Sequence, residues 1–261
     1  MDLIQIIILG VIQGITEFLP ISSSGHLVVC AALLEACGYE ELPDLLEVNV
    51  ALHLGTLLAV VVFYWRRVWQ LCGEDRRVLV MLVLGTFPAV VVGLPLKKMA
   101  PELLESPQLA GLMFLVTGGL LIWSRRLKVG ISDYQSLSVK QVLLVGIFQA
   151  IAILPGVSRS GATIIAGLAV GLKRDAAATF AFLLAIPAIA GAGVLESLDL
   201  IVRRGAETPM GYLAIGAMLS FIVGLLSLWA LIQLVQRGRL AYFAFWCIPL
   251  GIAVSIWQWL A

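Results

Sequence analysis

Six stretches of the chain are apolar over a length close to that of a membrane-spanning helix. Such a helix needs about 20 mostly apolar residues to cross the hydrocarbon core. We therefore expect six spanning helices, over residues 47–65, 78–96, 108–124, 176–195, 211–235 and 241–260. The pattern predicts an all-α, polytopic membrane protein.

Two further apolar segments are each interrupted by a polar turn. Residues 3–19 and 23–34 flank a Leu-Pro-Ile-Ser turn, and residues 139–154 and 160–172 flank a turn that begins Leu-Pro-Gly-Val-Ser at Leu154. Proline lacks a backbone N–H and disfavours helix in the residue before it. We therefore expect two re-entrant helical hairpins, about residues 3–34 and 139–172, each entering the membrane and leaving on the same face. The alternative is one long kinked span per segment.

The two interruptions follow one pattern. Five residues recur 136 positions later without a gap: Gly10, Gln13, Ser22, Ser24 and Gly25 correspond to Gly146, Gln149, Ser158, Ser160 and Gly161. We expect two repeats in one membrane domain, residues 1–136 and 137–261, each a hairpin followed by three spans. An odd number of spans makes the repeat inverted. Duplicated broken segments of this kind point to a binding site where the repeats meet.

Composition excludes a soluble globular protein, because 61% of residues are hydrophobic, 13% are charged and the mean hydropathy is +1.04. The first residues, Met1 and Asp2, lack the basic region of a removable signal, so we expect the N-terminus to begin the first membrane segment. The cysteines Cys30, Cys37, Cys72 and Cys247 have no metal or redox spacing and are interpreted as apolar filler. No basic tract suggests nucleic acid.

The basic residues are distributed unevenly between the two faces that this arrangement defines. One face has 12 of them and the other has four, with Arg159 left inside. The first group is Arg66, Arg67, Arg76, Arg77, Arg125, Arg126, Lys128, Lys140, Lys173, Arg174, Arg237 and Arg239, and the second is Lys97, Lys98, Arg203 and Arg204. The second face also carries the acidic segment Glu35, Glu40, Glu41, Asp44 and Glu47. Because cytoplasmic loops are enriched in Lys and Arg, we expect the first face to be cytoplasmic and both termini to lie outside. Hairpin 1 then opens outward and hairpin 2 inward.

The second interruption has the groups of a phosphate site. Ser158, Ser160 and Thr163 offer hydroxyl donors, and Arg159 offers a planar fork that suits phosphate oxygens. A helix begins at this point, and helix N-termini attract anions. The alternative is that the hydroxyls only cap the helix and Arg159 neutralises Glu17.

The first interruption supplies complementary groups. Gln13 and Glu17 are four residues apart, on one helix face, and Glu17 is a candidate cation ligand or proton-transfer group. After the turn, Ser22 and Ser23 precede His26, so a nucleophile and a proton-transfer group are both present. Glu17, His26 and Arg159 at membrane depth together indicate function, since buried charge is expensive there. His53 is equally compatible with a packed core position and with a site position.

With these residues in place, the chain resembles the bacterial undecaprenyl-pyrophosphate phosphatase family, which is also known for bacitracin resistance. The family's (Glu/Gln)-x-x-x-Glu motif is matched by Gln13 and Glu17, and its Ser-Ser-x-Gly-His motif by the residues from Ser22 to His26. Its Pro-Gly-x-Ser-Arg-Ser-x-x-Thr signature is matched from Pro155 to Thr163. The resemblance extends over the whole chain in length and hydrophobic layout.

This resemblance implies hydrolysis of undecaprenyl pyrophosphate to undecaprenyl phosphate and inorganic phosphate, which recycles the carrier lipid for peptidoglycan synthesis. It also implies a divalent cation, Mg²⁺ or Ca²⁺, and a multi-pass protein of the bacterial inner membrane whose site opens to the periplasmic face. The partners expected are the polyprenyl pyrophosphate, membrane lipid and no nucleic acid, with a homodimer as an option. Many members have Glu where this chain has Gln13, so a cation would depend more on substrate phosphates.

In the mechanism that we expect, Glu17, Ser23, His26 and Arg159 are catalytic. Ser22, Ser158, Arg159, Ser160 and Thr163 bind phosphate, and Glu17 and Gln13 hold the cation. The nucleophile is Ser23 with His26 as base, His26 itself, or water, with the first two favoured.

Three other readings compete with the phosphatase. A polyprenyl-phosphate carrier is favoured by inverted repeats with broken helices. A second lipid-phosphatase family shares the Ser-Gly-His sequence, but its Lys-x6-Arg-Pro motif is absent and no histidine follows Ser158-Arg159. A purely structural membrane protein has no use for three buried ionisable groups.

Overall fold

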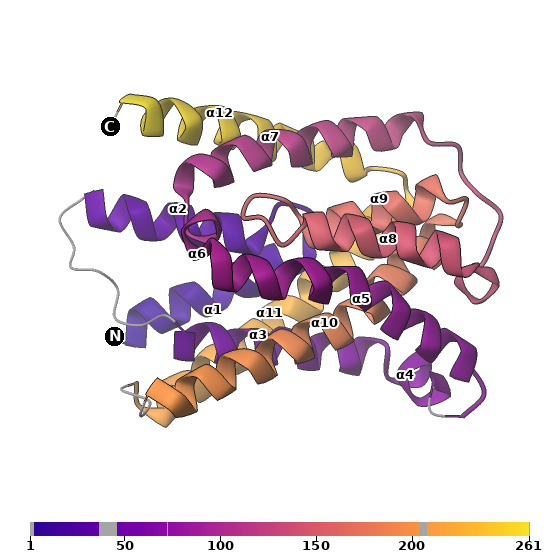
Figure 1. The fold of residues 1–261 in the computed structure, drawn as a ribbon, viewed down its shortest axis with the longest axis horizontal. Coiled ribbons are helices and arrows are strands. Elements are labelled where there is room, and N and C mark those ends of the chain that lie inside the picture. The colour runs from indigo at the N-terminus through magenta and orange to yellow at the C-terminus, as the bar shows by residue number, and fades with distance from the viewer. Residues whose placement is uncertain (1–2, 37–45, 72, 204–207, 261) are drawn as a thin grey trace.

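The computed structural model describes residues 3–36, 46–71, 73–203 and 208–260, and these ranges are almost entirely helical (Figure 1). The only pairing of strand type in them is an isolated bridge between Ser132 and Leu172. Most of the predicted acidic segment, together with Cys37, Cys72 and Arg204, lies outside the described residues. Cys30 is half-buried and Cys247 is buried, both as free thiols.

Both interrupted segments are hairpins, as predicted, because the chain reverses at each polar turn (Figure 1). The first consists of α1 (Leu3–Phe18) and α2 (Ser23–Ala36), and the second of α8 (Val139–Ile151) and α9 (Arg159–Ala169). Each turn contains one residue in the left-handed region, Ser22 with φ 70° and Gly156 with φ 91°. The open ends of the two hairpins lie at opposite ends of the molecule (Figure 1).

Five of the described helical segments are long and apolar enough to cross a membrane, and a sixth is obtained if α3 and α4, bent by 82°, are taken as one span. The helices outside the hairpins are α3 (Leu46–Phe63), α4 (Trp65–Leu71), α5 (Arg76–Met99), α6 (Pro101–Leu104), α7 (Pro107–Trp123), α10 (Arg174–Arg203), α11 (Met210–Gln236) and α12 (Ala244–Leu260). Short 3₁₀ turns are η1 (Ser124–Arg126), η2 (Tyr134–Ser136) and η3 (Leu240–Phe243). Five of the six predicted spans therefore correspond to helices of spanning length, and the first corresponds to α3, which reaches that length only together with α4.

Each hairpin packs against a long helix of the other half of the chain. Helix α1 lies along α11, and α8 lies along α5. Glycine makes the approach possible in both places. A Cβ on Gly10 would come within 2.9 Å of the Gly216 carbonyl oxygen, and one on Gly146 within 2.4 Å of the Gly85 carbonyl oxygen. Small residues at such contacts let helix backbones approach closely in membranes.

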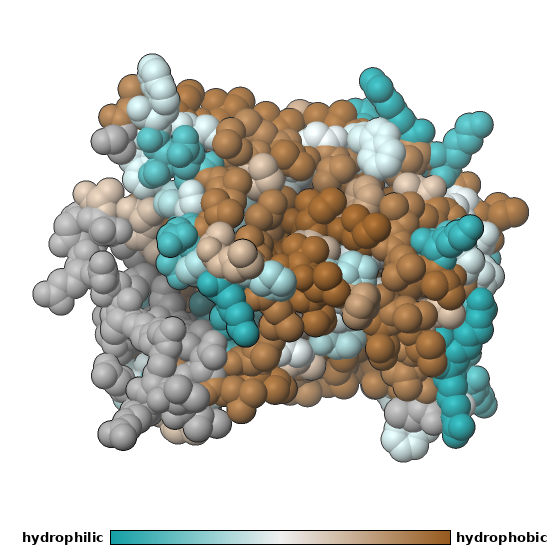
Figure 2. All heavy atoms as spheres, in the orientation of Figure 1, coloured by the Kyte–Doolittle hydropathy of each residue, from teal (hydrophilic) through white to brown (hydrophobic). Residues whose placement is uncertain are grey.

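The hydropathy of the surface changes along the long axis of the molecule (Figure 2). On the face shown, a broad apolar band crosses the middle, and hydrophilic side chains gather toward the ends (Figure 2). At the end that carries α4, the connections are tied together: Arg77 Nη2 donates to the Leu137 carbonyl oxygen at 2.8 Å, and Lys173 Nζ lies 3.0 Å from Asp133 Oδ2. The predicted basic-rich loops thus share one end of the molecule.

Candidate functional site

The tips of the two hairpins meet inside the molecule. Ser22 Oγ accepts hydrogen bonds from the backbone N–H of Gly25 at 3.3 Å and of Gly156, in the other hairpin, at 3.1 Å. A Cβ on Gly25 would lie 2.6 Å from the Gly156 nitrogen, and one on Gly161 would lie 3.1 Å from Pro20 Cβ. The glycines of the two signatures therefore allow the turns to touch.

Equivalent residues make the same bonds in the two tips. Ser158 Oγ accepts from the Gly161 N–H at 3.2 Å, as Ser22 Oγ accepts from Gly25. Ser158 and Ser160 Oγ are 3.1 Å apart, and Ser22 and Ser24 Oγ are 3.4 Å apart. The repeat seen in the sequence is thus a repeat of local hydrogen bonding.

Thr117 of α7 supports the second tip, and sequence reasoning missed it. Its hydroxyl donates to the Gly156 carbonyl oxygen at 2.7 Å and accepts from the Ser158 N–H at 3.1 Å. Thr117 is buried in an apolar helix, and this isolated hydroxyl was the signal that could have identified it.

Glu17, at the end of α1, is the centre of the polar cluster. Its Oε1 accepts a hydrogen bond from Arg159 Nη2 of the other hairpin. Its Oε2 accepts from Gln13 Nε2 at 3.0 Å and from Ser23 Oγ at 2.8 Å. The Glu17 side chain is 5% exposed and that of Arg159 is 23% exposed. A buried carboxylate with this many donors is compensated, as buried charge must be.

A cavity of about 260 Å³ opens beside this cluster. Polar side chains from both hairpins and from α3 line it: Thr16, Glu17, Ser22, Ser23, Ser24, His53, Ser158 and Arg159. The apolar part of its wall includes Ile153, Val157 and Ile189. Most of the residues that the two motifs predicted for the site therefore surround one space.

Besides Gln13, whose amide donates to Glu17 from outside the cavity lining, three more predicted site residues lie outside it. Ser160 Oγ donates to the Leu19 carbonyl oxygen at 3.3 Å, and Thr163 Oγ1 donates to the Arg159 carbonyl oxygen at 2.8 Å. The third, His26, has both ring nitrogens engaged, Nδ1 with the Ser22 carbonyl oxygen at 2.7 Å and Nε2 with the Trp246 indole N–H at 2.9 Å. Their direct roles in chemistry stay predictions.

His53, which the sequence left open between core and site, lies in the cavity wall. Its Nδ1 is 2.8 Å from the Asn49 carbonyl oxygen, and its Nε2 is 3.8 Å from Glu17 Oε2. The ring is 31% exposed. The structure therefore adds an imidazole to the Glu17 cluster, from helix α3, which carries neither motif.

Both contacts that the capping alternative required are present, since Ser158 caps α9 and Arg159 pairs with Glu17. The alternative does not account for the cavity. A helix cap and an ion pair do not need Ser22, Ser23, Ser24 and His53 around an adjoining space of this size. Arg159 lies at the cavity wall while it pairs with Glu17.

The same residues fit a divalent cation. Glu17 supplies a carboxylate, and the buried Gln13 Oε1 has no hydrogen-bond partner among the described residues. Mg²⁺ and Ca²⁺ take oxygen ligands, and Mg²⁺ commonly uses few protein ligands together with water and phosphate. These two oxygen groups therefore suit a divalent cation that uses few protein ligands.

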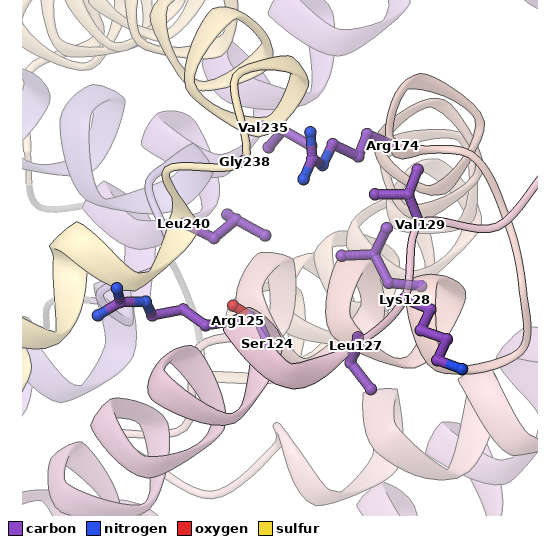
Figure 3. A pocket seen from close by; sticks show the side chains of 10 residues that line it. Ser124, Arg125, Leu127, Lys128, Val129, Arg174, Val235, Gly238 and Leu240 are labelled. Atoms are coloured by element: carbon purple, nitrogen blue, oxygen red, sulfur yellow. The ribbon is translucent and has the colours of Figure 1, made fainter.

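A second cavity, of about 170 Å³, lies at the end of the molecule that carries the basic loops. Arg125, Lys128 and Arg174 line it (Figure 3). The charged ends of Arg125 and Lys128 point away from each other and from Arg174, whose guanidinium lies near Gly238 (Figure 3). It includes none of the motif residues, so the first cavity is the candidate site.

The fold and the cavity define a class, a polytopic α-helical membrane protein with a polar cavity where two buried hairpin tips meet. The chain belongs to the bacitracin resistance protein BacA family, whose model matches residues 6–253. It is 49% identical over 256 residues to a Rhodopirellula baltica protein named undecaprenyl-diphosphatase, with 98% of each chain covered. Proteins with the same name from Halothermothrix orenii and Korarchaeum cryptofilum are 36% and 38% identical, again with at least 97% of each chain covered.

Proposed function

We propose that the protein hydrolyses undecaprenyl pyrophosphate to undecaprenyl phosphate and inorganic phosphate within the bacterial inner membrane. The observation that carries this proposal is the Glu17–Arg159 pair, which joins the two hairpin tips at a cavity lined by hydroxyl groups. The relatives' shared name supports the same substrate. Recycling of the carrier lipid for peptidoglycan synthesis, and resistance to bacitracin, follow from this activity.

Arg159 is the phosphate clamp in this proposal. When a pyrophosphate enters, the guanidinium exchanges the carboxylate of Glu17 for phosphate oxygens, which it binds through parallel N–H groups. Ser22 and Ser158 line the same space. Positioning and neutralisation of charge provide most of the catalysis in phosphoryl transfer.

Ser23 is the nucleophile that the contacts favour, because its hydroxyl already donates to Glu17 Oε2 at 2.8 Å. Ser23 Oγ attacks the terminal phosphorus while its proton passes to Glu17, and the bridging oxygen leaves with the lipid phosphate. Water then releases phosphate from the serine. Direct attack by His26, and attack by water, are the alternatives.

The nucleophile has its own test. Brief reaction followed by denaturation and mass spectrometry is expected to find phosphate on the peptide that contains Ser23. Phosphate on the His26 side chain, or full activity of Ser23→Ala, contradicts this assignment.

Glu17 and Gln13 would hold the cation, Mg²⁺ or Ca²⁺, which neutralises phosphate charge when bound. Glu17 has two carboxylate oxygens, and only Oε1 is paired with Arg159. The Gln13 amide presents its nitrogen to Glu17, and turning it over presents the unpaired Oε1 instead.

We further propose that the two halves are an inverted repeat with two re-entrant hairpins and that the end with the termini is periplasmic. Helix α1 of the first half packs on α11 of the second half, and α8 of the second half packs on α5 of the first; this reciprocal packing supports the repeat. The basic loops lie together at the end opposite the termini, which supports the orientation. Ala188 and Ala192 line the cavity from the half of α10 nearer the termini, which supports opening to the periplasm. A homodimer stays a prediction.

The test is release of inorganic phosphate from farnesyl or undecaprenyl pyrophosphate by the purified protein in detergent. We expect release with Mg²⁺, loss of release with chelator, and loss in Glu17→Ala and in Arg159→Ala. Asp133→Ala, which breaks an exposed ion pair far from the cavity, is the matched control and is expected to keep activity. No release from folded wild-type protein contradicts the proposal.

A carrier of polyprenyl phosphate is the second candidate, favoured by the two hairpins that open toward opposite ends. The same preparation distinguishes the two. Binding of lipid phosphate by wild-type protein without any phosphate release would favour the carrier.

A further inference from the structure

His53 is the one titratable residue of the cavity wall that the proposed mechanism does not use. It lies in the first half of α3. Its Nδ1 contacts a backbone carbonyl oxygen, and such an oxygen can only accept a hydrogen bond. The 2.8 Å contact with the Asn49 carbonyl therefore places a proton on Nδ1. In the neutral ring, Nε2 then carries a lone pair and is free to bind.

The neighbour of that lone pair is another acceptor. His53 Nε2 lies 3.8 Å from Glu17 Oε2, which is longer than the roughly 3.2 Å limit of a normal N–H···O hydrogen bond. When the imidazole is neutral, the lone pair of His53 Nε2 therefore faces the negatively charged Glu17 Oε2. A cation between them removes the repulsion.

The spacing suits a shared cation. Two ligand atoms that bind one ion at about 2.0–2.2 Å lie at most roughly 4.4 Å apart, so 3.8 Å is within reach. Histidines that bind metals almost always donate the other ring N–H to a carbonyl or carboxylate, which fixes the ring. His53 has this arrangement with Asn49.

We propose that His53 Nε2 is a ligand of the divalent cation, together with Glu17 Oε2 and the Gln13 amide oxygen. This inference depends on the cation site of the proposed function. Imidazole nitrogen binds transition-metal dications far better than Ca²⁺ or Mg²⁺, which select oxygen ligands. The site therefore prefers a first-row transition-metal dication over Ca²⁺.

The probe is Mn²⁺ bound to the purified protein in detergent, without substrate. Pulsed electron paramagnetic resonance detects imidazole nitrogen on the ion, and ¹⁵N-histidine changes the signal. We expect nitrogen coupling in wild type, its loss in His53→Gln, and its retention in His26→Gln. The chain has two histidines, so His26→Gln is a complete control for the origin of the signal.

Affinity provides a second readout. We expect wild-type protein to bind Mn²⁺ at least 10-fold more tightly than Ca²⁺, and His53→Gln to lose most of that preference, since it replaces nitrogen by an amide oxygen. Glu17→Gln is expected to weaken the binding of both Mn²⁺ and Ca²⁺. These measurements need no turnover.

Bound Mn²⁺ without nitrogen coupling, or coupling that persists in His53→Gln, overturns the inference. Absence of Mn²⁺ binding overturns it as well and leaves an imidazolium–Glu17 pair as the explanation of the geometry. Phosphate release, measured on the same preparation, separates the two proposals. Phosphate release without nitrogen coupling on Mn²⁺ contradicts only the role of His53 as a ligand. Nitrogen coupling without phosphate release contradicts only the phosphatase proposal.

Discussion

At the scale of single residues, Ser22 combines an unusual backbone with a structural hydroxyl. Its φ of 70° lies in the left-handed region that favours glycine. Its Oγ accepts hydrogen bonds from the N–H groups of Gly25 and Gly156, which glycine could not do. We expect Ser22→Ala to destabilise the protein by about 1–3 kcal/mol, because two buried donors lose their acceptor. Ser22→Gly loses the same bonds but relieves the backbone, so it is expected to be about 1 kcal/mol less damaging.

Thermal unfolding of both variants in detergent tests this prediction. The order of the two is the informative result, since the lost hydroxyl is common to them. Equal stability of Ser22→Ala and wild type would show that the bonds across the two tips contribute nothing.

Phosphate release is expected to fall even when Arg159 is replaced by lysine. Arg159→Lys retains the charge beside Glu17 but loses the planar fork for phosphate. We expect phosphate release to fall by roughly 100-fold, the cost of removing one transition-state donor. Arg174→Lys, at the second cavity, is the matched control and is expected to keep activity. Similar rates for both variants would show that Arg159 acts only as a charge.

At the scale of elements, the hairpins act as one unit because their tips touch. A Cβ on Gly25 would lie 2.6 Å from the Gly156 nitrogen, so Gly25→Ala must push the tips apart. We expect a loss of stability of about 1–3 kcal/mol and a fall in activity of about 100-fold, since small displacements of catalytic groups are costly.

Gly119→Ala is the matched control for this prediction. Gly119 also lies in a helix, but a Cβ there would meet nothing within 4 Å. We expect unchanged activity and unchanged or slightly raised stability, because alanine favours helix. Unfolding in detergent and phosphate release together measure both variants, and normal activity of Gly25→Ala would contradict the role of the tip contact.

At the scale of the whole molecule, the two ends should face different compartments. We expect an impermeant maleimide to label Glu105→Cys, beside α6, in intact cells and to label Gly73→Cys, beyond α4, only after the membrane is opened. The background replaces all four native cysteines, Cys30, Cys37, Cys72 and Cys247. The opposite labelling pattern would reverse the proposed orientation.

The fold was largely predictable because its signals are local. Apolar length identified the spans, and the prolines with the 136-residue recurrence identified both hairpins. The least accurate prediction concerned the first span, since α3 ends at Phe63 and bends into α4. Hydropathy does not report a bend between two apolar helices.

The candidate site was predictable in part. The motifs named Glu17, Ser23 and Arg159, which the structure brings to one cavity. They did not name Thr117 or place His53, because each is a single polar residue in an apolar helix of ordinary appearance.

By itself, the sequence determined the membrane class, the two hairpins and the types of group at their tips, because helix length, proline and residue chemistry are local properties. Only the tertiary structure decided which groups meet. It brought Arg159 of one half to Glu17 of the other and added His53 from α3, and it directed His26 toward Trp246. These choices depend on how close helices can pack, which glycines such as Gly10 and Gly25 set through contacts with residues distant in the chain.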